Sequence, residues 1–199
     1  MVAPSRLKRS DRRGETMPNP WDRPAWPDHG EDECEPIYLA VGHALSQWAD
    51  VEECISDFFV FFIGQEEADS PAIRAYTSID GARNRIGMVR SAAEAWFERF
   101  PGCPLKENVF EAFRVCQEWS ARRNEIAHGT TDLPVDTPGA TWFLYPGYLT
   151  KRRQTDRNKA EFRYNAKQIE QMANDFEQVE IRLWQLIASL RAWRRELCG

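Results

Sequence analysis

This chain of 199 residues lacks any apolar run as long as a membrane-spanning helix, and its amino terminus has no hydrophobic signal core. It has only three histidines, and no His, Cys or Asp cluster has metal-ligand spacing, so the sequence predicts no metal centre. Its five cysteines are odd in number, widely spaced and form no Cys-x-x-Cys pair, which is typical of reduced thiols. We therefore expect a soluble cytoplasmic protein with no membrane partner and no cofactor.

The chain also lacks a large excess of either charge. A formal net charge of -5 argues against nucleic-acid binding over the whole surface, while a local basic patch remains compatible with it. Residues 1 to about 33 contain a basic cluster, several prolines and an acidic run, with little to bury except Trp21 and Trp26. This composition predicts a disordered tail over 1–33, and the length of the remainder fits one domain over 34–199.

Apolar residues recur at spacings of three and four along four long stretches, which predicts four helices. The expected ranges are 36–63, 70–100, 104–128 and a last helix that follows Asn165. Gly81 and Gly87 are positions where the second helix can bend.

The segment 130–165 breaks this periodicity and predicts a short two-stranded ribbon, formed by Thr141–Tyr145 and Glu161–Tyr164. Between these strands lies a basic stretch that includes Lys151, Arg152 and Arg153. The fold class that follows is all-α, an antiparallel four-helix bundle with a β-hairpin insert before the last helix.

Arg123 is the unusual residue of the third predicted helix. At roughly 100° per residue, it falls inside the apolar stripe that contains Val109 and Phe113. A guanidinium facing a core must be paired or lie in a polar site. Glu52 occupies a similar inward position on the first helix, so we expect Glu52 and Arg123 to pair, with Glu180 on the last helix as the alternative partner.

The third helix ends in Arg123-Asn124-Glu125-Ile126-Ala127-His128, and Gly129 follows as a stop signal. The pattern Arg123-Asn124-x-x-x-His128 resembles the signature of HEPN domains. The resemblance covers about residues 36–197 and includes the four helices, the motif at the end of the third, and a variable insert before the last. Many HEPN proteins are metal-independent endoribonucleases of toxin-antitoxin and antiviral systems, and they typically dimerise so that two motifs form one cleft.

The resemblance implies a role for each motif residue. His128 would transfer a proton at the attacking 2'-hydroxyl or the leaving 5'-oxygen. Arg123 would hold the scissile phosphate, and Asn124 would orient the imidazole or bond the phosphate. Glu52 would hold Arg123 in place.

The implied partners are RNA, a second copy of the chain and an antitoxin, such as a nucleotidyltransferase-like protein. Candidate RNA contacts are the basic residues of the insert and two arginines at the edge of the apolar stripe of the second helix. The position of these two arginines fits a solvated side chain equally well. These residues are Lys151, Arg152, Arg153, Arg83 and Arg90. Phe61 points away from the apolar stripe of the first helix, which predicts surface for a homodimer.

Two plainer interpretations remain open. A histidine before a C-terminal glycine is commonly a helix-end cation with no chemical role. Some HEPN domains, moreover, are non-catalytic modules that dimerise or bind a protein or nucleotide, and in such a module Arg123 and Glu52 would form a structural ion pair.

Overall fold

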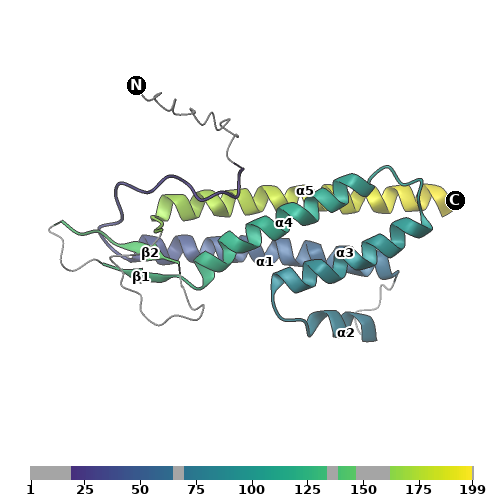
Figure 1. Ribbon diagram of the computed structural model, residues 1–199, viewed down its shortest axis with the longest axis horizontal. Helices are drawn as coiled ribbons and strands as arrows, with labels where there is room; N and C mark the ends of the chain where they lie inside the picture. Colours follow the sequence, from purple (N-terminus) through teal and green to yellow (C-terminus); the bar gives the residue numbers. More distant parts are fainter. Residues whose placement is uncertain (1–18, 65–69, 134–138, 147–161, 199) are drawn as a thin grey trace, which may run out of the picture.

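The computed structural model describes residues 19–64, 70–133, 139–146 and 162–198, and these residues are mostly helical (Figure 1). The helices are α1 (Glu35–Ile63), α2 (Pro71–Thr77), α3 (Ala82–Arg99), α4 (Lys106–Ala127) and α5 (Ala166–Cys198). The strands are β1 (Thr130–Asp132) and β2 (Phe143–Tyr145), which form one small antiparallel sheet. The predicted all-α class is confirmed.

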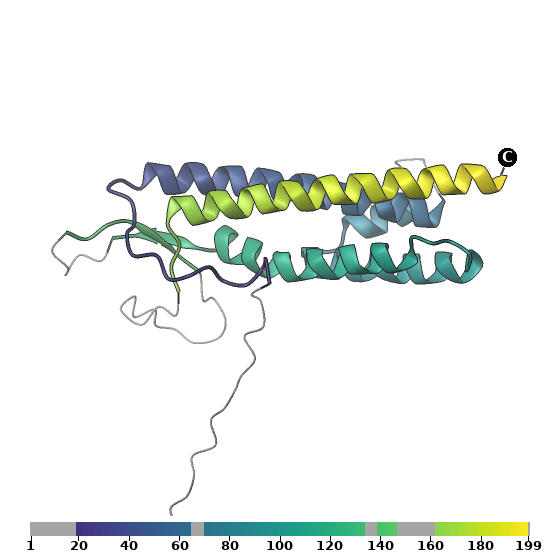
Figure 2. The ribbon, with the colours of Figure 1, turned by 90° about the horizontal axis from the view of Figure 1, so that it is seen from above.

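The two longest helices, α1 and α5, lie side by side and run in the same direction (Figure 2). His43 near the start of α1 lies 2.8 Å from Glu170 near the start of α5. Asp57 and Arg191, near the other ends, lie 3.5 Å apart. The prediction of an antiparallel arrangement is therefore wrong for this pair.

The direction of α3 also matches that of α1, whereas α4 runs the opposite way. Between α1 and α3, the short helix α2 carries the chain back along the molecule (Figure 1). One predicted helix over 70–100 is thus two helices. Gly81 separates them with a φ of +82°, a backbone conformation that strains any residue with a side chain.

The strand predicted over Thr141–Tyr145 pairs mainly with a segment other than the expected Glu161–Tyr164. β2 pairs with β1, which follows α4 directly, with Thr131 opposite Leu144. Tyr164 contributes only a single bridge to Leu144. The two threonines of β1 favour a strand, but its three residues show no alternation of apolar and polar side chains, so the sequence did not predict its pairing with β2. The last helix begins directly after Asn165, as expected, and Asn165 caps it, because its Oδ1 accepts the backbone N–H of Gln168 at 3.0 Å.

Aromatic side chains fill the interface of the long helices. Phe58 packs edge-on against Phe113, and Phe176 packs against both Trp48 and Trp119. Phe61 is 6% exposed, because Trp96 of α3 contacts its ring. The prediction of an exposed apolar surface at Phe61 is therefore wrong.

Residues 19–33, which we call the N-terminal strap, lie against the helices and the sheet. The Gln168 amide donates to the backbone oxygen of Ala25 at 2.7 Å, and the Glu31 and Trp142 backbones exchange two hydrogen bonds. A side chain at Gly30 would collide with the backbone oxygen of Trp142, which explains the glycine there. The prediction of a disordered tail is wrong for 19–33, and residues 1–18 lie outside the described residues.

Candidate functional site

The predicted motif lies where α4 joins the sheet. His128 is the C-cap of α4, its backbone N–H donates to Asn124 O at 3.1 Å, and its side chain is exposed. A Cβ on Gly129 would lie 2.8 Å from two carbons of Leu144 and 3.0 Å from Glu125 O. The glycine that ends the motif therefore lets β2 pack directly against the end of the helix.

Glu52 of α1 is the carboxylate that faces Arg123, as the helical register predicted. The distance from Arg123 Nη2 to Glu52 Oε1 is 3.8 Å, which is an ion pair but longer than a hydrogen bond. Two other donors lie closer to Glu52. Trp48 Nε1 donates to Oε1 at 2.6 Å, and Arg85 Nη1 donates to Oε2 at 3.2 Å.

Arg85 was not singled out from the sequence. It lies on α3, shares a helix face with Val89 four residues later, and also donates from Nε to the backbone oxygen of Ile79 at 2.9 Å. That i, i+4 relation to a buried residue is the signal that could have identified it. Four side chains, Trp48, Glu52, Arg85 and Arg123, thus form what we call the Glu52 cluster.

Arg123 is less buried than its place in the apolar stripe predicted, with 30% of its side chain exposed. Its Nη1 donates to Asn124 Oδ1 at 3.2 Å. Its Nε is buried and has no hydrogen-bond partner among the described residues. Much of the hydrogen-bonding capacity of this guanidinium is therefore uncommitted.

A second polar cluster, also missed from the sequence, surrounds Glu125. Its carboxylate lies 2.9 Å from Arg23 of the strap and 3.0 Å from Arg122, and it accepts the hydroxyl of Tyr164. Burial, followed by the hydrogen bond and the negative charge of Glu125, raises the pKa of Tyr164 well above its usual range, so the phenol keeps its proton. Glu125 connects the strap and Tyr164, which lies two residues before α5, to the helix turn that precedes His128.

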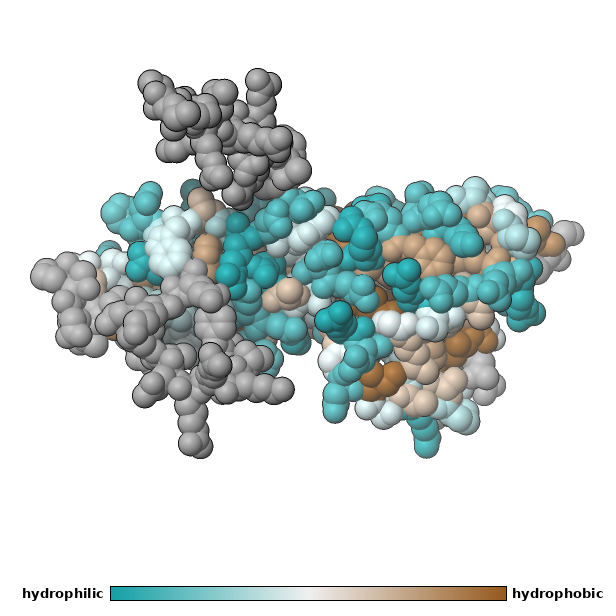
Figure 3. All heavy atoms as spheres, in the orientation of Figure 1, coloured by the Kyte–Doolittle hydropathy of each residue, from teal (hydrophilic) through white to brown (hydrophobic). Residues whose placement is uncertain are grey.

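The remaining candidates lie apart from these clusters or outside the described structure. Arg83 is exposed on the first turn of α3. Arg90 is exposed and pairs with Glu94 at 3.2 Å. Lys151, Arg152 and Arg153 lie outside the described residues. In Figure 3, the side chains that are not grey are mainly hydrophilic at the end of the molecule that carries the sheet, and apolar ones gather toward the opposite end.

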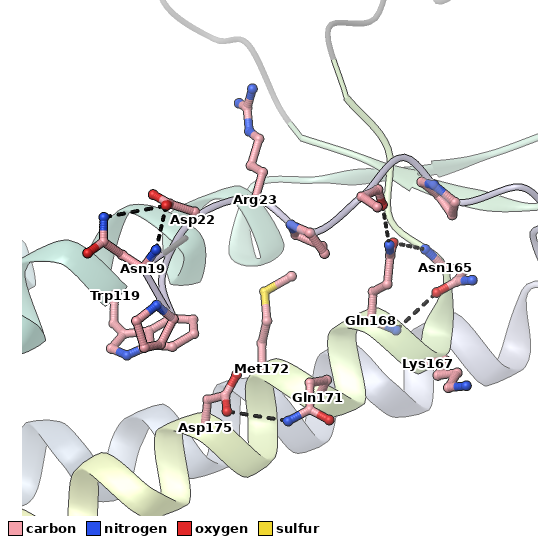
Figure 4. A pocket seen from close by; sticks show the side chains of 14 residues that line it. Asn19, Asp22, Arg23, Trp119, Asn165, Lys167, Gln168, Gln171, Met172 and Asp175 are labelled. Atoms are coloured by element: carbon pink, nitrogen blue, oxygen red, sulfur yellow. Dashed lines mark hydrogen bonds between the residues drawn. The ribbon is translucent and has the colours of Figure 1, made fainter. Parts of the chain in front are cut away.

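A pocket of about 590 Å³ lies between the strap, α4 and α5 (Figure 4). Met172 points into it, whereas Arg23 points away. Burial raises the pKa of Asp175 at its edge, and a 3.3 Å hydrogen bond from Gln171 partly opposes the shift. None of the predicted catalytic residues lines this pocket.

Comparisons with protein-family models, curated proteins and solved structures give no match for this chain. Among the described residues, no group of three or more His, Cys, Asp or Glu is arranged to hold a metal ion, and no helix is long and apolar enough to cross a membrane. The resemblance to HEPN domains consequently stays a prediction that rests on this chain's own residues.

Proposed function

We propose that this protein is a metal-independent endoribonuclease of the HEPN type and acts as a toxin or antiviral defence effector. The observation that carries the proposal is the end of α4, where the partly exposed Arg123 lies beside Glu52 and His128 is exposed one turn after Asn124. The lengthwise packing of the four long helices supports a HEPN-like four-helix bundle as the scaffold.

The reaction would be attack by the 2'-hydroxyl on the adjacent phosphorus. The 2'-oxygen loses its proton and forms a bond to phosphorus while the 5'-oxygen leaves and gains a proton, so the products are a 2',3'-cyclic phosphate and a 5'-hydroxyl. An imidazole is suited to one of these proton transfers near neutral pH, and His128 is accessible for it. Arg123 would bind the phosphate oxygens and stabilise the charge that develops on them.

Asn124 supports this assignment through two relations. Its Oδ1 accepts a hydrogen bond from Arg123, which leaves the amide N–H groups to face the phosphate or the imidazole. It also precedes His128 by four residues, so both lie on one side of the helix end.

A homodimer would complete the site. Arg123 and His128 are five residues apart, which separates them by about 140° around the helix axis. One motif therefore directs its two principal groups to different sides of α4, and a second copy related by a two-fold axis would supply the complementary group. An antitoxin would then act by covering this shared cleft.

The alternative is a non-catalytic module that binds a protein or nucleotide partner. Two exposed apolar side chains favour it, since Ile181 and Trp184 are each 42% exposed and lie three residues apart on α5. In this case, the Glu52 cluster would be a structural ion-pair network between helices.

The test is to incubate purified protein with an RNA pool in the presence of EDTA and to analyse the product ends. We expect cleavage that leaves cyclic phosphates, and a loss of roughly 10² to 10⁴ in rate for His128→Ala. The unfolding free energy of His128→Ala should change by no more than about 1 kcal/mol, because the side chain lies at a helix end. His43→Ala, which removes an exposed histidine on α1, is the matched control and should cleave normally. Intact RNA with every substrate, or undiminished cleavage by His128→Ala, would favour the binding module.

A further inference from the structure

The Glu52 cluster contains one carboxylate and two guanidiniums, so it has a surplus of one positive charge. The three charged side chains are between 24% and 32% exposed, and the surplus charge is therefore neither deeply buried nor fully solvated. A half-buried surplus charge of this kind favours the binding of an anion.

The two arginines differ in how firmly the protein holds them. Arg85 is anchored at both ends of its guanidinium, by Ile79 O at Nε and by Glu52 Oε2 at Nη1. Arg123 makes one hydrogen bond, to Asn124, and its Nε is buried without a partner among the described residues.

Both oxygens of Glu52 already have a closer donor than Arg123. Trp48 occupies Oε1 at 2.6 Å, and Arg85 occupies Oε2 at 3.2 Å, whereas Arg123 approaches Oε1 only to 3.8 Å. A free carboxylate beside a guanidinium would form a short bidentate pair. Each carboxylate oxygen can accept a second hydrogen bond, so the two closer donors compete with Arg123 for Glu52 without filling it. At 3.8 Å, Arg123 does not form a short bidentate pair with Glu52.

We infer that Arg85 is a positioning residue that competes with Arg123 for Glu52 and thereby keeps Arg123 available to bind a phosphate group. This inference rests on the proposed function, because the phosphate would be that of an RNA phosphodiester. It assigns opposite effects to the two neighbours of Arg123: Glu52 alone would sequester the arginine, and Arg85 prevents this.

The test measures the binding of inorganic phosphate to the full chain by ³¹P NMR titration, without any need for cleavage. The variants are Arg85→Gln, Glu52→Gln and the double variant. We expect Arg85→Gln to weaken phosphate binding roughly tenfold or more, the scale of one hydrogen bond to a charged group. In the double variant an uncharged amide replaces the carboxylate of Glu52 and no longer captures Arg123, so binding should recover most of this loss. Arg99→Gln removes an exposed arginine from the far end of α3 and should bind as wild type does.

A purely structural role for Arg85 gives a different pattern, in which the two substitutions add and the double variant is at least as weak as Arg85→Gln. Any of three results would overturn the inference: this additive pattern, an unchanged phosphate affinity in Arg85→Gln, or no phosphate binding by the wild type. If Arg85→Gln does not fold, Arg85→Lys takes its place in the test. It keeps the charge but loses one of the two anchoring bonds, so its phosphate affinity should lie below that of the wild type. Failure of the proposed function is distinguishable, because RNA would stay intact while the phosphate pattern still held.

Discussion

Replacing Glu52 by alanine removes an acceptor that three side chains share. Trp48 loses the oxygen that accepts its indole N–H, Arg85 loses one of its two anchors, and Arg123 loses its ion pair. The structure lets these losses be weighed separately, since Trp48 is 1% exposed while the two arginines are about one-third exposed.

The indole N–H is the costly loss. A buried donor left without an acceptor costs about 1–3 kcal/mol, whereas partly exposed ion pairs contribute about 1 kcal/mol or less. We therefore expect Glu52→Ala to lower the unfolding free energy by roughly 2–4 kcal/mol. Glu52→Gln keeps an oxygen for Trp48 and removes only the charge, so it should cost roughly 1 kcal/mol.

Urea unfolding followed by circular dichroism measures both variants. At about 2–4 °C per kcal/mol for a chain of this size, the difference between them should also be visible as a shift in Tm. Combining Glu52→Ala with Trp48→Phe gives a further check, because the second change removes the orphaned donor and the two losses should be less than additive. Equal destabilisation by Glu52→Ala and Glu52→Gln would refute this account of the cluster.

Two further predictions concern stability and thiol chemistry. Gly129→Ala places a Cβ 2.8 Å from Leu144 and should cost about 1–3 kcal/mol in thermal unfolding. The added cost of Gly129→Ala should be smaller in a Leu144→Ala background, because the clashing side chain is then absent. An unchanged Tm would contradict the close packing of β2 on α4. Burial raises the pKa of Cys54 and Cys116 to about 12, so alkylation at pH 8, mapped by mass spectrometry, should label the half-exposed Cys34 before either of them. Because these thiols stay protonated in the folded protein but ionise near pH 9 when unfolded, they lower stability as the pH rises above 9, by up to about 1.4 kcal/mol per pH unit each. Early labelling of Cys54, or an alkaline slope unchanged by its replacement with alanine, would be inconsistent with that burial.

The sequence by itself determined α1, α4 and α5 and most of their ends. α1 and α4 begin and end within two residues of their predicted bounds, and Ser70 and Asn165 cap the helices they precede. These features depend on an apolar stripe and on capping bonds within a few residues, so they are local properties of the chain. The same register argument placed Glu52 opposite Arg123, because two inward charges on packed helices tend to meet.

Only the tertiary structure decided how these elements are arranged. The parallel course of α1 and α5 depends on the break at Gly81, and the choice of β1 as the partner of β2 depends on where α4 ends. Arg85 reaches Glu52 from a helix 33 residues along the chain, and its closeness decides how much of Arg123 is left for a ligand. Periodicity reports which face of a segment is buried, but the partner that buries it is selected by long-range packing, which no local pattern encodes.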